Sequence, residues 1–353
     1  MFLDLNEFCS SLKSALSNDP SVAIAADNDL DGLFSAIQLD MGLYNLYEIE
    51  VETYFRDEVR WEIPIDQKFD LLIMTDLAYD NTPNYRNAVG KAAQSFAIDH
   101  HVTKEFPQRV KAYNPCKSGQ CYQPATFLVN KILKRLGQET NTLNEYLNLL
   151  GVLADAGINF KIQKDKIQYF YDSSLKEVFS KGFKQFSFFF EEKKFNGLVY
   201  PRFKETIEAL NCEAGEVGWK EIYLRFINEV TDLSAAQELV GNIEEKNKDS
   251  FFELIQQVPK EPTELTKSGI WIVKNTTSIS NGTIGRIIAE LIGKPILAYS
   301  CKKFCRVSAR APSDSTINFI PFFSGFGGGH PKACGAFLNQ SQFKLFLAKI
   351  KEI

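Results

Sequence analysis

The stretch VAIAADNDLDG, residues 22–32, predicts the architecture of the first part of the chain. Its five apolar residues are typical of a buried strand, and an acidic cluster follows them directly. Apolar residues then recur at helical spacing from Leu33 to Tyr44. We therefore expect a strand, a loop and a helix, the unit from which largely parallel sheets are built.

This unit recurs along the N-terminal part of the chain. Three further apolar runs lead into polar or charged residues, and two stretches with helical spacing follow them. The pattern predicts an α/β fold whose N-terminal domain has a mainly parallel sheet flanked by helices. The further strands are predicted at 50–55, 71–75 and 95–98, and the helices at 125–136 and 143–153.

Acidic residues stand where the predicted strands end. Asp27 follows the first strand and Asp76 the third. Asp99 and His100 follow the fourth, and Asp155 follows the second of the two helices. Ligands of parallel sheets bind beyond the carboxyl ends of the strands. We therefore expect these side chains to meet at one edge of the sheet.

A different pattern begins at about residue 261, after a stretch from 160 to 260 that is rich in Lys, Glu and Phe and is interpreted as helical. From residue 261, strands are predicted at 270–273, 295–299 and 304–308, with a helix at 283–292. We expect the active site in a cleft between domains. The predicted regions are 1–180, a catalytic metal-binding domain, 181–260, a helical connecting region, and 261–353, a smaller α/β domain.

Composition limits the class of protein. The chain of 353 residues has no apolar run that approaches the roughly 18 residues of a membrane span, and its start lacks the basic and apolar regions of an export signal. These features predict a cytoplasmic protein whose seven cysteines are reduced, including the pair Cys301 and Cys305, which fits zinc motifs poorly.

Charge is unevenly spread along the chain. The net charge is −4, and residues 261–353 hold 12 Lys and Arg against 5 Asp and Glu, which gives +7 and leaves −11 for residues 1–260. An acidic part that could hold cations and a basic part that could hold anions suit a metal enzyme with a phosphate-bearing substrate. Chance distribution of surface charge is the alternative.

The acidic cluster also matches the start of an EF-hand calcium loop. The twelfth position of such a loop would be Gln38 instead of a bidentate Glu, and the cluster follows a strand instead of a helix. Taken alone, the cluster could be a solvated acidic loop. Together with the other strand-end residues it favours a site for two divalent ions, with Mn²⁺ preferred and Mg²⁺ or Zn²⁺ as alternatives.

Four motifs carry a family resemblance. Residues 27–32, Thr75-Asp76, Ile98-Asp99-His100-His101 and Leu153-Ala154-Asp155 resemble, in order, the motifs of the DHH phosphoesterase superfamily. The segment GFGGGHP, residues 325–331, is similar to the DHH-associated substrate domain of that superfamily. The resemblance implies a metal-dependent phosphodiesterase that uses a metal-activated water.

The resemblance also implies roles for individual residues. Asp27 and Asp29 would hold one metal ion, and Asp76 would bridge to the other. His101 would contact the scissile phosphate or act as general acid, with Asp99 orienting the histidines. The remaining residues with implied roles are Asp31, His100 and Asp155 as ligands of the second ion, and Gly327, Gly328, Gly329, His330, Ser308, Arg310 and, more weakly, Arg286 as substrate contacts.

Several functions remain open at this point. The aspartate-led first motif is similar to that of RecJ-type single-strand exonucleases, which favours release of mononucleotides from short or single-stranded oligonucleotides. The pI of about 5.6 and the lack of room for an extra oligonucleotide-binding barrel oppose long-strand binding. The alternatives are a linear or cyclic dinucleotide phosphodiesterase, a pyrophosphatase or polyphosphatase, and a non-catalytic replication or repair scaffold.

Overall fold

The structure is a computed structural model that divides into two compact units. The first contains Met1–Asp155 and Glu205–Lys248, and the second contains Asp249–Ile353, each with shorter additional pieces. The structure describes residues 1–56, 68–77, 83–101, 106–117, 123–139, 141–155, 189, 191–195, 198–259, 261–277, 280–312 and 315–352.

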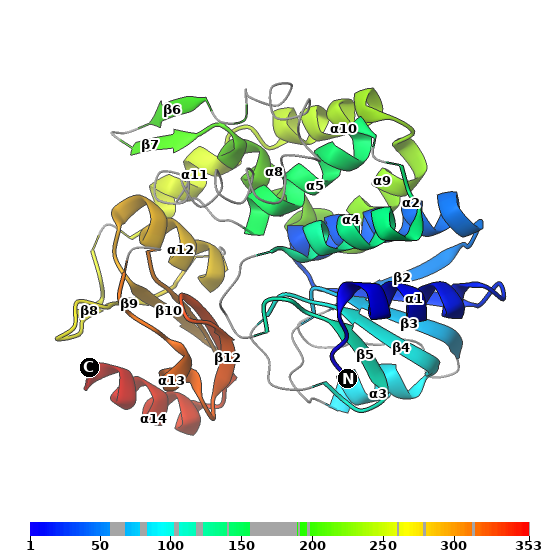
Figure 1. Cartoon of the computed structure of the whole chain (residues 1–353). Coiled ribbons are helices and arrows are strands. Elements are labelled where there is room, and N and C mark those ends of the chain that lie inside the picture. Colours follow the sequence, from blue (N-terminus) through cyan, green and yellow to red (C-terminus); the bar gives the residue numbers. More distant parts are fainter. Residues whose placement is uncertain are drawn as a thin grey trace. The chain divides into compact units, whose positions relative to one another are not determined.

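Five strands form the sheet of the first unit, in the order β2-β1-β3-β4-β5, and every neighbouring pair is parallel (Figure 1). β2 and β3 flank β1 on opposite sides, so the order of the strands reverses at β1. The predicted mainly parallel sheet is confirmed, and β5 is a strand that the sequence pattern did not indicate. The strands are β1 Val22–Ala26, β2 Val51–Phe55, β3 Phe69–Thr75, β4 Ala92–Ile98 and β5 Val110–Tyr113.

Helices pack on both faces of this sheet. On one face, Ala23 and Ala25 of β1 belong to a core cluster with Ala88 and Val89 of α3. On the other face, α1, α2 and α4 contact the strands, and α4 also contacts both α1 and α2 (Figure 1). The two helices predicted in this part are confirmed. The helices are α1 Leu5–Leu16, α2 Leu30–Tyr47, α3 Pro83–Gly90, α4 Ala125–Leu136 and α5 Thr142–Asp155.

The helix α2 is buried on nearly every side. It contacts α4, α5 and α9, and a helix that is apolar all round is stable only when neighbours cover it. Phe34 of α2 meets Phe226 of α9 with ring centroids 5.5 Å apart, and the Tyr223 hydroxyl of α9 donates a hydrogen bond to Asp40. These contacts fix the helix that begins at the acidic cluster. Four helices lie in the described residues between 200 and 260: α8 Phe203–Val217, α9 Trp219–Glu229, α10 Leu233–Lys246 and α11 Ser250–Gln257.

Residues 160–260 are not wholly helical, and this corrects the interpretation of the sequence. β6, Glu192–Phe195, and β7, Leu198–Pro201, form an antiparallel pair. The Asn-Gly dipeptide at 196–197 is a strong hairpin signal that the composition of this stretch obscured. Residues 156–188 lie outside the described part of the chain and include the predicted boundary at 180. The three predicted regions and the cleft between domains stay predictions.

The second unit contains a mixed sheet of six strands, in the order β12-β13-β11-β10-β9-β8. Only β9 and β10 are parallel among these described neighbours. This confirms a second, smaller α/β domain, and it adds β8, β12 and β13 to the predicted strands. The strands are β8 Glu264–Leu265, β9 Trp271–Lys274, β10 Ile296–Cys301, β11 Cys305–Arg310, β12 Gly327–His330 and β13 Ala333–Leu338.

Different helices pack on the two faces of this second sheet. Ile284 and Ile287 of α12 pack on one face, against Ile296 and Ala298. Helices α13 and α14 pack on the other, where Phe346 is fully buried. Among the described residues, no helix combines the length and apolar character needed to cross a membrane. The helices are α12 Asn281–Ile287 with a π-helical turn Ile288–Ile292, α13 Ile320–Phe323 and α14 Gln340–Lys351.

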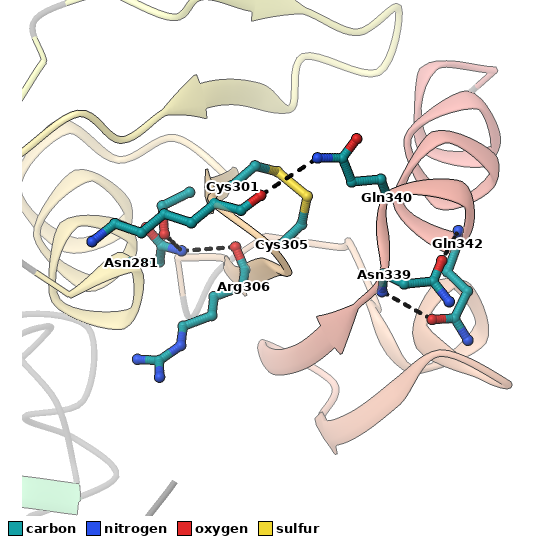
Figure 2. The surroundings of a disulfide bond; sticks show 9 residues. Asn281, Cys301, Cys305, Arg306, Asn339, Gln340 and Gln342 are labelled. Atoms are coloured by element: carbon teal, nitrogen blue, oxygen red, sulfur yellow. Dashed lines mark hydrogen bonds between the residues drawn. A yellow bond between two sulfur atoms is a disulfide. The ribbon is translucent and has the colours of Figure 1, made fainter. Parts of the chain in front are cut away.

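The expectation that every cysteine is reduced is wrong. Cys301, the last residue of β10, and Cys305, the first of β11, form a disulfide across the end of a hairpin (Figure 2). The strand register puts these two residues directly opposite each other, with Cα atoms 4.0 Å apart, which their spacing alone did not reveal. Cys116 is also disulfide-bonded, whereas Cys9, Cys212 and Cys334, all among the described residues, are thiols.

The close approach of α4 and α5 depends on a glycine. A Cβ atom at Gly151 of α5 would lie 2.2 Å from the Thr126 hydroxyl of α4, so Gly151→Ala must displace one helix. We expect a loss of about 1–3 kcal/mol in the free energy of unfolding, measured by urea denaturation. Gly241→Ala is the control, because nothing lies within 4 Å of its position in α10 and alanine there should add up to about 1 kcal/mol. Equal effects of the two substitutions would contradict this account of the packing.

Candidate metal centre

Acidic and amide side chains meet at the carboxyl edge of the N-terminal sheet. The register pairs Ala26 of β1 with Thr75 of β3, Thr75 with Ile98 of β4, and Ile98 with Tyr113 of β5. Each of these strands is followed at once by a polar residue, so the register brings the polar residues to neighbouring positions. They are Asp27, Asp76, Asp99 and Asn114. The reversal of strand order at β1 falls at the same edge, where open α/β sheets bind ligands.

Asp31 enters the cluster from the first turn of α2. It is 2% exposed, and its carboxylate accepts hydrogen bonds from the backbone amides of Ala125 at 2.7 Å and Thr126 at 2.8 Å. The Thr126 hydroxyl also donates to it. These donors lie at the N-terminus of α4, where the unpaired amides of a helix favour an anion. The first turn of α4 therefore holds Asp31 in place.

His100 lies among three carboxylates. Its Nε2 is 3.1 Å from Asp76 Oδ1 and 3.8 Å from Asp31 Oδ2, and its Nδ1 is 3.8 Å from Asp155 Oδ2. Two sets of three residues have ligand atoms within 4.8 Å of one another: Asp31 with His100 and Asp155, and Asp76 with His100 and His101. Carboxylate and imidazole together form the ligand type that first-row divalent ions take.

Two of these carboxylate oxygens are buried without a hydrogen-bond donor from the described part of the chain: Asp76 Oδ1 and Asp155 Oδ2. A buried anionic oxygen without a donor is costly, and a cation between the two sets would satisfy both oxygens. Asp76 also has a backbone φ of 58°, in the left-handed region that residues other than glycine rarely adopt and that often marks functional sites. The residues fit a divalent ion.

The pKa values of the carboxyl groups show that burial and proximity disfavour their charged forms. Burial first, and then the charge of Asp29, raise the pKa of Asp27 to about 6. Burial and the neighbouring carboxylates also raise the pKa values of Asp31 and Asp76 well above the ordinary range. Burial lowers the pKa of His100, which keeps this ring neutral and able to ligate a metal.

His101 differs from His100 because it is paired. Its Nδ1 donates a hydrogen bond to Asp99 Oδ1 at 2.7 Å. Burial alone would lower the pKa of His101, but the charge of Asp99 and this hydrogen bond raise that pKa to about 9. For Asp99, burial is outweighed by the same partner, so its pKa is lowered. His101 is therefore protonated near neutral pH.

Asp27 and Asp29 lie outside both sets of ligand atoms. The Asp27 carboxylate is 3.6 Å from the guanidinium of Arg56, which follows β2. Asp29 caps α2 and accepts a hydrogen bond from the backbone amide of Gly32 at 2.9 Å. Their charges nevertheless act on the cluster, because each contributes to raising the pKa of Asp76.

The candidate substrate residues of the second unit gather along β11. Arg310 Nη1 donates to Ser308 Oγ at 3.0 Å, and a Cβ atom at Gly282, at the start of α12, would lie 3.6 Å from Arg310 Nη2. Arg286 lies in the last turn of the same helix. The N-terminus of α12, Ser308 and Arg310 thus form one polar cluster.

Close packing against β13 explains two of the three glycines in β12. A Cβ atom at Gly327 would lie 2.1 Å from the carbonyl oxygen of Gly335, and one at Gly329, where φ is 139°, would lie 2.2 Å from that of Ala333. Both glycines are thus required by the close approach of β13. Gly328 has open space around it, and the backbone of His330 pairs with β13.

Sequence reasoning missed three residues that shape the centre. Asn114 donates from Nδ2 to Asp99 Oδ2 at 3.3 Å and to the carbonyl of His101 at 2.8 Å, and it would have been found had the short strand β5 been recognised. Thr126 and Arg56 reach the cluster only through tertiary contacts, so no local pattern indicates them.

The comparisons with known proteins agree with this arrangement. Residues 21–154 match the family model described as DHH family, N-terminal domain. This region belongs to the DHH family. No curated protein matches the chain.

Solved structures share the fold of this chain at low sequence identity. RecJ of Thermus thermophilus in complex with Mn²⁺ has a TM-score of 0.63 and 19% identity, covering 99% of this chain and 54% of that one. Exonuclease RecJ bound to manganese has a TM-score of 0.56 and 17% identity, covering 99% and 93%. The DHH domain of a member of the s1p family of ribosomal proteins has a TM-score of 0.70 and 14% identity, covering 98% and 89%. The chain spans about half the length of the Thermus protein, and at these low identities the structural matches establish the fold alone.

The raised carboxyl pKa values predict how pH affects the metal-free chain. A raised folded-state pKa stabilises the fold at low pH, and this contribution is lost as the pH rises through the folded-state pKa, which is about 6 for Asp27 and is also raised for Asp31 and Asp76. The lowered pKa of His100 makes the fold more stable as the pH rises, but this single opposing contribution is smaller than the combined effect of the three carboxylates. We expect the chelator-treated chain to lose about 1–2 kcal/mol of unfolding free energy between pH 5 and pH 7.

Urea denaturation at the two pH values measures this loss. Addition of Mn²⁺ should cancel it, because a bound cation replaces the protons that the cluster otherwise needs. A metal-free chain that is more stable at pH 7 than at pH 5 would contradict this electrostatic account.

Proposed function

We propose that the chain is a metal-dependent phosphodiesterase that releases mononucleotides from short or single-stranded oligonucleotides. The observation that carries the proposal is the cluster of buried carboxylates around His100, with Asp76 Oδ1 and Asp155 Oδ2 left without donors from the described residues. The cluster lies where the order of the strands reverses, within the region that matches the DHH family, and this position supports the same function.

Two divalent ions fit the ligand set. Asp31, His100 and Asp155 would hold one ion, Asp27 and Asp29 would contribute to the other, and Asp76 would lie between them. Mn²⁺ suits mixed carboxylate and imidazole ligands, with Mg²⁺ as the alternative. When bound, such ions supply a water of lowered pKa and neutralise charge on the phosphorus-bound oxygens. Two of the solved structures with this fold were determined with manganese.

His101 fits the role of proton donor. Its pairing with Asp99 keeps it protonated near neutral pH, and it is one of the residues in the set around Asp76. A protonated imidazole at that position can give its proton to the leaving oxygen of a diester. Asp99 and Asn114 would hold the ring and its backbone in position.

A nucleic-acid substrate is supported by the basic second unit and by the polar cluster of Ser308 and Arg310, which could hold a phosphate. Linear or cyclic dinucleotides need the same metal chemistry and form the second candidate. Pyrophosphate or polyphosphate comes third, and a non-catalytic scaffold in replication or repair comes last, because that role has no use for a complete ligand set.

A cytoplasmic location stays a prediction. The disulfide between Cys301 and Cys305 weighs against it, because disulfides persist mainly in oxidising compartments. Alkylation of the protein directly after cell lysis, followed by mass spectrometry of the peptides, measures whether these two thiols are oxidised where the protein works.

Hydrolysis of a labelled single-strand series tests the function directly. The series runs from dinucleotides to about thirty nucleotides in RNA and DNA, with Mn²⁺ or with chelator; the family's two-metal chemistry predicts cleavage only with the ion. Rates that rise with length favour an exonuclease, and rates that peak at a few nucleotides favour an oligonucleotide scavenger. Absence of metal-dependent cleavage at every length would contradict the proposal and direct attention to cyclic dinucleotides and pyrophosphate.

Asp76→Asn should separate stability from activity. Asparagine tolerates the left-handed backbone at this position and removes one of the repelling charges, so the metal-free chain should unfold at higher urea concentration. Diester hydrolysis should fall by about a hundredfold or more, because a central ligand is lost. Asp19→Asn is the matched control: Asp19 is exposed and also left-handed, with φ 50°, and its substitution should change neither property. Retained activity in Asp76→Asn would contradict the role of Asp76.

A further inference from the structure

Two phenylalanines form an exposed stack on the second unit. Phe304, in the loop between β10 and β11, and Phe337 of β13 have ring centroids 5.0 Å apart and planes inclined by 28°. They are 42% and 59% exposed, and they are the exposed phenylalanines among the described residues of a chain with 29. Aromatic rings of this size are usually buried. An exposed stacked pair therefore calls for an explanation.

Basic groups surround this aromatic stack. The Arg306 guanidinium lies 5.9 Å from the centre of the Phe337 ring, and Lys302 and Lys303 are exposed in the same loop as Phe304. From residue 293 to residue 351 the sequence holds nine Lys and Arg and one acidic residue. An aromatic surface in a strongly basic setting is complementary to a ligand that combines flat rings with negative charge.

The stack continues the polar cluster along β11. Arg306, Ser308 and Arg310 alternate along this strand, so they lie on one face of the sheet. Phe337 pairs with Arg306, and Gly335 pairs with Ser308, on that same face. Two residues along a strand span about 6.8 Å, so the aromatic surface begins one such step from the candidate phosphate contact.

The loop that carries Phe304 is held at both sides. The disulfide between Cys301 and Cys305 closes it, and the Gln340 side chain donates to the carbonyl of Lys302 at 3.4 Å (Figure 2). Asn281 of α12 donates to the carbonyl of Arg306 at 2.8 Å, while the Arg306 side chain extends away from the disulfide (Figure 2). These contacts restrain the backbone on both sides of Phe304 and leave its ring exposed.

We propose that Phe304, Phe337 and Arg306 form a stacking platform for the bases of a single-stranded nucleic acid whose phosphate is held by Ser308 and Arg310. This rests on the proposed function in one respect, the class of substrate. Stacking on aromatic rings accepts any base, because every base has a flat face. The platform would therefore favour substrates longer than a dinucleotide without selecting their sequence.

The experiment compares binding and chemistry in the same chain. Binding is measured by fluorescence anisotropy with a twelve-nucleotide oligothymidine whose phosphorothioate linkages resist cleavage, in the presence of Mn²⁺. Chemistry is measured as kcat for bis(4-nitrophenyl) phosphate at saturating concentration, so that stacking of its two rings on the platform affects only the KM. The test variant is Phe304→Leu with Phe337→Leu, which keeps apolar surface and removes the flat faces. Leu345→Ala on α14, at a residue 68% exposed, is the matched control.

The platform predicts that the double variant binds the oligonucleotide about tenfold more weakly than the wild-type chain and hydrolyses the small diester with an unchanged kcat. The control variant should match the wild-type chain in both measurements. Phe337→Trp should keep the affinity. Unchanged oligonucleotide binding in the double variant would overturn the platform, as would a wild-type chain that does not bind the oligonucleotide.

Two other results distinguish the platform from the proposed function and from self-association of the chain. If the wild-type chain binds the oligonucleotide through these rings and hydrolyses no diester, the proposed function fails and the platform stands. If the double variant loses only self-association in sedimentation experiments, the rings serve a second copy of the chain and the platform is overturned.

Discussion

The main physical constraint on the N-terminal unit is that several negatively charged carboxylates are buried close together. Asp31 and Asp76 are 2% and 1% exposed, and their pKa values are raised by burial and by the neighbouring carboxylates. Carboxylates so placed must bind protons or a cation. The fold holds them in place at some cost, with Asp31 fixed by the start of α4 and Asp76 in a left-handed backbone conformation. A site that keeps this repulsion is built for a ligand of opposite charge.

The strand-end residues could be predicted because they depend on local sequence alone. Short apolar runs identify β1, β3 and β4, and the edge of a parallel sheet follows from their direction, so Asp27, Asp76 and Asp99 are expected together. Asn114 and Thr126 could not be found in this way. β5 is too short to give a clear pattern, and Thr126 acts through a contact 95 residues away in sequence.

In the second unit, the glycine motif at 327–329 has more than one physical explanation. Gly327 and Gly329 allow β12 to approach β13, and this explains both without reference to a substrate. The backbone of Gly328 is open, as a phosphate-binding strand requires. Sequence alone cannot separate these causes, because register decides which glycine faces a neighbouring strand. The disulfide between Cys301 and Cys305 was missed for the same reason, since only the hairpin register places the two residues opposite each other.

The central claim is that the buried carboxylates and His100 hold divalent metal. Electron paramagnetic resonance during titration of the chelator-treated chain with Mn²⁺ tests it most directly, because free, singly bound and coupled Mn²⁺ give different spectra. The account predicts that two ions bind to each chain and that their signals are coupled, as expected for ions about 4 Å apart. A spectrum of free Mn²⁺ alone, at millimolar concentrations of the ion, would contradict the account.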